Sequence, residues 1–83
     1  MIIEDLRSDL VDYINKHNLT KKWEKAKKLF EEKFNHPSLN TELLEPHRRG
    51  IFSFRIDRQY RSIFFITKQN TAEIITITNH YKK

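Results

Sequence analysis

Apolar and polar positions divide the chain into a helical first half and a β-rich second half. Apolar residues recur three and four positions apart over residues 5–17 and again after Thr20, which is the spacing of one helix face. We predict two amphipathic helices there, the second with Thr20 as its N-cap and ended by the segment Asn35-His36-Pro37-Ser38. The first apolar stripe is Leu6, Leu10, Tyr13 and Ile14, and the second is Trp23, Ala26, Leu29, Phe30 and Phe34.

The second half of the chain has the two-residue period of β-strands. Phe52, Phe54 and Ile56 alternate with polar residues, and two further β-branched and aromatic runs follow at 61–67 and 72–81. Short polar links between these runs predict an antiparallel meander. The predicted fold class is therefore α+β, with two N-terminal helices packed on one face of a small antiparallel sheet.

Three finer features follow from the local pattern. Leu43-Leu44 is a candidate short strand at the start of the meander, and Met1-Ile2-Ile3 is compatible with a brief edge strand. Regular alternation in the last strand predicts Ile75 and Ile77 on one face of the sheet and Ile74 on the other.

Length and composition favour a single domain over residues 1–83. A chain of 83 residues buries only about 60–65% of its unfolded surface and cannot support two cores. It contains no cysteine, so disulfides and thiolate metal sites are excluded. No apolar run approaches the roughly 20 residues of a membrane span, and the first residues do not resemble a signal peptide. We therefore expect a cytoplasmic protein with no membrane partner.

The net charge of +5 is unevenly distributed along the chain. Residues 1–19 contain four acidic and two basic side chains, a net −2, so the remaining residues carry +7. Such a basic surface suits a polyanion such as nucleic acid, because Lys and Arg contacts to phosphate release condensed counterions, or an acidic protein partner. A soluble basic domain without such a ligand is the alternative that charge alone leaves open.

Arg55 and Arg61 flank the predicted turn between the first two long strands. A three-residue loop at 57–59 would place them opposite each other, with both side chains leaving the same face of the sheet. The loop lacks glycine, which disfavours a two-residue turn. Facing guanidiniums destabilise a strand pair by a few tenths to about 1 kcal/mol, a cost that a phosphate bound between them would offset. Two solvated arginines with a carboxylate neighbour such as Asp57 are the alternative.

The order of these features resembles the RelE/ParE superfamily of bacterial toxins, most closely its YoeB-like and RelE-like members. The resemblance rests on GIFSFRIDRQYRSIFF, residues 50–65, followed by a β-branched strand that ends in His80-Tyr81, and it covers most of the chain. Family members of the nuclease type are ribosome-dependent endoribonucleases that cut mRNA and are held inactive by a cognate antitoxin. The resemblance therefore implies a toxin of a type II toxin–antitoxin system, with an antitoxin, the ribosome and mRNA as partners.

The resemblance also implies roles for individual residues. Arg55 and Arg61 match positions that stabilise the scissile phosphate, and His80 and Tyr81 match a terminal pair used for proton transfer and substrate positioning. In this chemistry the RNA 2′-hydroxyl attacks the adjacent phosphate, a base accepts its proton, and an acid protonates the leaving 5′-oxygen. No metal or other cofactor is expected, because the histidines lack the spacing of a metal site. A lone histidine with a purely structural role is the alternative for His80.

The general base is less clearly defined by the sequence. Counting back without a gap from Gly50 places Glu42 on the family's catalytic glutamate, and a shift of three residues would select Glu45 instead. The resemblance leaves two other functions open: inhibition of DNA gyrase by a non-cleaving member, a branch that usually lacks the terminal histidine, and RNA binding by a degenerate member. Further side chains expected to contact substrate are Arg58, Tyr60, Lys82 and Lys83.

Overall fold

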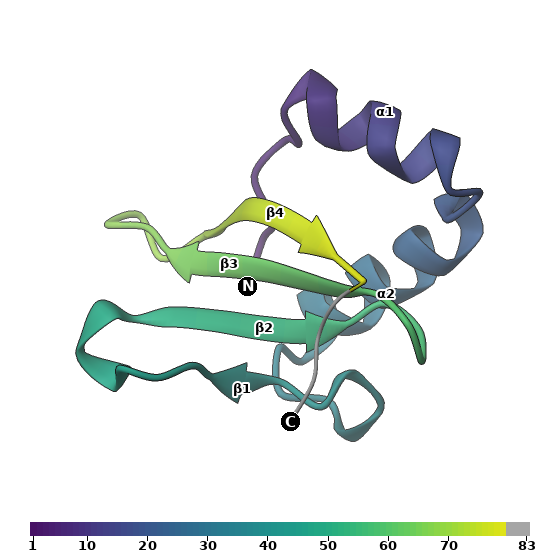
Figure 1. Ribbon diagram of the computed structural model, residues 1–83. Helices are drawn as coiled ribbons and strands as arrows, with labels where there is room; N and C mark the ends of the chain where they lie inside the picture. Colours follow the sequence, from purple (N-terminus) through teal and green to yellow (C-terminus); the bar gives the residue numbers. More distant parts are fainter. Residues whose placement is uncertain (80–83) are drawn as a thin grey trace.

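In the computed structural model, which describes residues 1–79, two α-helices pack against a four-stranded antiparallel sheet (Figure 1). The strands lie in the order β1-β2-β3-β4, so each strand pairs with its neighbour in sequence. This confirms the predicted α+β class with helices before strands. The elements are α1 (Ser8–Lys16), α2 (Thr20–Glu32), β1 (Glu42–Leu43), β2 (Ile51–Arg55), β3 (Arg61–Ile66) and β4 (Ala72–Thr78), with 3₁₀ turns η1 (Pro37–Leu39) and η2 (His47–Arg49).

The first helix begins later than its apolar stripe suggested. α1 starts at Ser8 rather than near residue 5, because the preceding segment is held in an extended conformation by the sheet. Ile3 forms a parallel bridge with Ala72, and the Ala72 N–H donates to the Ile2 carbonyl at 2.8 Å. The first residues therefore form the brief edge pairing that their composition allowed.

The start of the second helix also differs from the prediction. Thr20 is the first residue of α2 and Leu19 is its N-cap, without a side-chain capping bond. The Thr20 hydroxyl instead donates to Asn15 Oδ1 at 3.2 Å, which ties α2 to the end of α1. The predicted capping role of Thr20 is therefore wrong. The helix ends at Glu32, before the predicted stop signal, and Pro37 begins η1.

The core lies between the helices and the inner face of the sheet. Phe30 of α2, Phe54 of β2 and Phe64 of β3 are fully buried, and the Phe30 ring centroid lies 4.8 Å from that of Phe54 and 5.1 Å from that of Phe64. Trp23 stacks on Phe54 at 6.0 Å. The apolar stripe predicted for the second helix therefore faces the sheet as expected.

The last strand departs from regular alternation at one position. Ile63 pairs with Thr76 whereas the next residue, Phe64, pairs with Ile74, so Ile75 is an extra residue that forms a β-bulge. Ile74 and Ile77 are consequently both buried on the helix side. The predicted assignment of Ile74 and Ile77 to opposite faces is therefore wrong, because the bulge changes the phase of the strand.

In the described part of the chain, α1 and α2 both fall short of the length and apolar character that a membrane-crossing helix needs.

Candidate active site

The two arginines that flank the β2–β3 turn are cross-strand partners. Arg55 at the end of β2 pairs in register with Arg61 at the start of β3. The Ile56 N–H donates to the Tyr60 carbonyl at 2.9 Å, which leaves a three-residue loop at 57–59. This confirms the predicted register. Because side chains of paired residues leave the same side of a sheet, both arginines project from the face opposite the one that Phe54 presents to the helices.

Asp57 holds this loop closed. Its Oδ1 atom accepts hydrogen bonds from the N–H groups of Gln59 and Tyr60, both at 2.8 Å, and its Oδ2 atom accepts one from Lys22 Nζ at 3.0 Å. Burial acts to raise the pKa of Asp57, but the Lys22 bond and the two N–H donors outweigh it, so the pKa is lower than usual. The carboxylate thus pairs with a lysine of α2 and not with Arg55.

The two arginines have different environments. Arg55 is exposed, whereas Arg61 is only 4% exposed. The Arg61 Nε and Nη2 atoms donate to Ser53 Oγ at 3.1 and 2.9 Å, and Nη2 also donates to the Asn40 carbonyl at 2.6 Å. Arg55 therefore offers a surface contact, whereas Arg61 is a charge fixed within the sheet.

Of the two candidate bases, the structure brings Glu42 to the arginine pair. Glu42 is half-buried and is the cross-strand partner of Ser53, the residue whose hydroxyl binds Arg61. Its Oε2 atom accepts a hydrogen bond from Asn40 Nδ2 at 3.3 Å. Glu45 is exposed in the segment after β1 and outside the sheet. The geometry therefore favours Glu42 over Glu45 as a group that acts together with Arg55 and Arg61.

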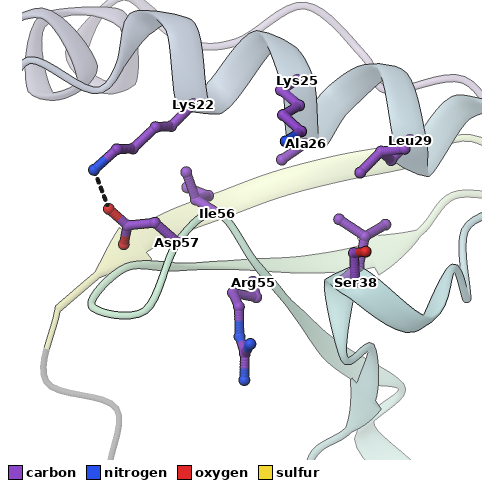
Figure 2. A pocket seen from close by; sticks show the side chains of 9 residues that line it. Lys22, Lys25, Ala26, Leu29, Ser38, Arg55, Ile56 and Asp57 are labelled. Carbon is purple, nitrogen blue, oxygen red and sulfur yellow. Dashed lines mark hydrogen bonds and ion pairs between the residues drawn. The ribbon is translucent and has the colours of Figure 1, made fainter.

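Arg55 also borders a groove between α2 and the end of β2, with a volume of about 260 Å³. In Figure 2, Lys25 and Leu29 extend from α2 toward this α2–β2 groove, while the Arg55 side chain points away from the helix. A second hollow of about 540 Å³ lies beside it and includes Arg58. The α2–β2 groove is lined by Lys22, Lys25, Ala26, Leu29, Ser38, Leu39, Arg55, Ile56 and Asp57.

The remaining predicted site residues have different outcomes. Arg58 is exposed at the tip of the loop, as a substrate contact requires. Tyr60 is buried, and its ring contacts Tyr13 and His17 of the α1 region at centroid distances of 6.2 and 5.7 Å. The predicted substrate contact of Tyr60 is not supported, because the ring packs in the core. His80, Tyr81, Lys82 and Lys83 lie outside the described residues.

Sequence reasoning missed two polar residues that support the arginine pair. Ser53 is fully buried on the arginine side of the sheet, and Asn40 lies between η1 and β1. Ser53 could have been suspected from its place two residues before Arg55 on the polar side of the alternation. The Asn40 contact could not have been found, because it joins Asn40 to Arg61 across 21 positions in the chain.

Among residues 1–79, no group of three or more His, Asp or Glu side chains is arranged to hold a metal ion. In comparisons with known proteins, no family model matches the chain and no curated protein shows a significant match.

Proposed function

We propose that the protein is the toxin of a type II toxin–antitoxin system and acts in the cytoplasm as a ribosome-dependent mRNA endoribonuclease. The observation that best supports this proposal is the shared position of Glu42, Arg55 and Arg61 on three adjacent strands, on the sheet face opposite the helices. A carboxylate beside two guanidiniums provides a base and positive charge at one place.

Each described residue has a distinct task in this proposal. Glu42 accepts the proton of the RNA 2′-hydroxyl as that oxygen attacks the adjacent phosphate. Arg55, which is exposed, donates paired N–H groups to the phosphate oxygens. Arg61 is buried and bound to Ser53, so its charge stabilises the transition state without having to move.

Other residues complete the proposed site. His80 is the proposed acid that protonates the leaving 5′-oxygen, and Tyr81 is proposed to position the substrate, both on the strength of the motif resemblance. The exposed Arg58, with Lys82 and Lys83, is proposed to contact the RNA backbone. The reaction uses the 2′-hydroxyl of the substrate as its nucleophile, and the proposal assigns no role to a metal.

The proposed partners are a cognate antitoxin, the ribosome and mRNA. The surface beside Arg55 carries further cations, with Lys22 and Lys25 on α2 and Arg58 on the loop. We expect the antitoxin to present an acidic segment to this surface, because opposite charges on two binding surfaces guide their association.

The decisive test is primer extension on a defined mRNA incubated with purified protein, with and without 70S ribosomes whose P site is occupied. We expect cleavage only with ribosomes. Arg55→Ala should lower the rate about 10²- to 10³-fold, as for loss of one donor to a transition-state oxygen. Lys28→Ala is the matched control, since Lys28 is exposed on α2 and does not line the α2–β2 groove.

The other outcomes are equally informative. An equal loss of cleavage rate in Arg55→Ala and Lys28→Ala would show that Arg55 has no specific role. Cleavage without ribosomes would remove the ribosome from the proposal. A protein that cuts nothing but still arrests growth would point to gyrase inhibition, which a supercoiling assay would detect.

A further inference from the structure

Asn40 contacts two of the three charged groups of the candidate site, Arg61 and Glu42. It follows η1 and has a φ of +47°, a left-handed conformation that asparagine tolerates better than most residues. In this conformation its carbonyl accepts the bond from Arg61 Nη2 at 2.6 Å, and its side-chain amide donates to Glu42 Oε2 at 3.3 Å. The backbone of one residue thus binds the cation and its side chain binds the carboxylate.

The Arg61 guanidinium is held from two directions. Ser53 binds it from β2, and Asn40 binds it from the segment that leads into β1. Hydrogen bonds to a charged donor in a buried position are short and strong. The segment around Asn40 is therefore fixed relative to β3. Strand β1 begins at Glu42, only two residues after Asn40.

We propose that Asn40 is a positioning residue that holds the Glu42 carboxylate at a set distance from the buried Arg61 guanidinium. This inference rests on the proposed function, in which Glu42 is the general base. It assigns Asn40 no contact with the RNA. Among the residues that the structure describes, the charged side chain on β2, the strand paired with β1, is Arg55, and the one on β3, the next strand of the sheet, is Arg61.

The substitution Asn40→Asp tests the contact between the Asn40 side chain and Glu42 separately from the backbone contact with Arg61. Aspartate has the same shape and also tolerates a left-handed backbone, and the backbone carbonyl that binds Arg61 is retained. The substitution replaces an N–H donor to Glu42 with a second carboxylate, which makes ionisation of Glu42 less favourable. We expect the acidic limb of the pH–rate profile for mRNA cleavage to move to higher pH by about 0.5–1 unit, a modest value because the site is partly solvated.

The chain offers a closely matched control at Asn70. Asn70 also has a positive φ, +65°, but it lies in the turn between β3 and β4. Asn70→Asp makes the same change in charge and shape in the same backbone conformation, away from Glu42. It should leave the acidic limb unchanged. Equal shifts of the acidic limb in Asn40→Asp and Asn70→Asp would show that the shift comes from the change in net charge alone. This result would overturn the inference.

A second measurement needs neither RNA nor ribosomes. A ¹³C NMR titration of the Glu42 side-chain carboxyl should give a higher midpoint in Asn40→Asp than in the unsubstituted protein, and no change in Asn70→Asp. Asn40→Gly should shift the midpoint less and in the same direction, because glycine adopts positive φ freely and only the amide donor is lost. This variant also serves if Asn40→Asp does not fold.

The two measurements separate failure of the inference from failure of the proposed function. A shifted Glu42 titration in a protein that cuts no mRNA would contradict the nuclease proposal and the catalytic part of the inference, while the contact to Asn40 would stand. Cleavage by the unsubstituted protein, with unshifted titration and pH profile in both Asn40 variants, would refute the positioning role alone.

Discussion

Asp57 shows how one side chain can stabilise the loop that joins the two arginine-bearing strands. Its pKa is lowered in the folded protein, so folding favours the ionised carboxylate. The resulting stability is fully present above the pKa of about 3.9 expected in the unfolded chain, and it is lost as pH falls through the lower folded value. Asp57→Asn should reduce the free energy of unfolding by about 1 kcal/mol at pH 7.

Urea denaturation at pH 7 and at several values between pH 4 and pH 2 tests this prediction. The difference in stability between Asp57→Asn and the unsubstituted protein should shrink across the acidic range. Asp12→Asn on the exposed side of α1 is the control and should have little effect. A constant difference at all pH values would show that ionisation of Asp57 does not contribute.

Substitution of Ser62, unlike that of Asp57, is not expected to destabilise the protein. Its side chain is 0% exposed, and its Oγ atom has no hydrogen-bond partner among the residues that the structure describes. Burial of an unsatisfied hydroxyl costs about 1–3 kcal/mol. Ser62→Ala should therefore leave the free energy of unfolding unchanged or raise it by up to about 1 kcal/mol, measured by urea denaturation. A clear loss of stability would mean that the hydroxyl has a partner after all.

Residue type alone could not distinguish Arg55 from Arg61. Both follow a β-strand pattern, and the predicted loop length correctly placed them opposite each other. Arg61 differs from Arg55 in its hydrogen bonds to the Ser53 hydroxyl and the Asn40 carbonyl. Contacts of this kind depend on side-chain direction and on chain segments that are distant in sequence, so the local pattern contains no information about them.

At the scale of secondary-structure elements, Phe30 of α2 is central to the packing of the helix on the sheet. Phe30 is fully buried against Phe54 and Phe64. Phe30→Ala should cost about 3–5 kcal/mol, a large share of the roughly 4–12 kcal/mol expected for a domain of this size. Thermal and urea denaturation would measure the loss. Phe30→Leu, which keeps most of the apolar volume, should cost clearly less, and equal losses would contradict the packing argument.

Element types were predictable because each has its own hydrophobic period. The helix stripes and strand alternation identified α1, α2 and the strands, and the pair Leu43-Leu44 anticipated β1 to within one residue. The errors occur where pairing with a distant segment of the chain changes the local structure. The pairing of Ile3 with Ala72 delays the start of α1, and the bulge at Ile75 changes the phase of β4. The hydrophobic period of a single segment contains no information about either effect.

At the scale of the whole molecule, the core and the candidate site occupy different sides of the sheet. The aromatic core lies between the sheet and the helices, and Glu42, Arg55 and Arg61 lie on the other face. Substitution of the exposed Arg55 therefore changes the proposed chemistry without removing core contacts. Arg61 is the exception, because its bonds join β3 to β2 and to the segment before β1.

The position of Trp23 has a practical consequence for such experiments. It is the only tryptophan in the chain, it is 7% exposed, and it stacks on Phe54 at the centre of the fold. An indole shielded from water emits at shorter wavelength than one in contact with it, so the chain carries its own optical reporter of folding. Fluorescence at a single excitation wavelength can show, for every variant at Asn40, Asp57 or Arg55, whether an altered activity comes from a protein that is still folded.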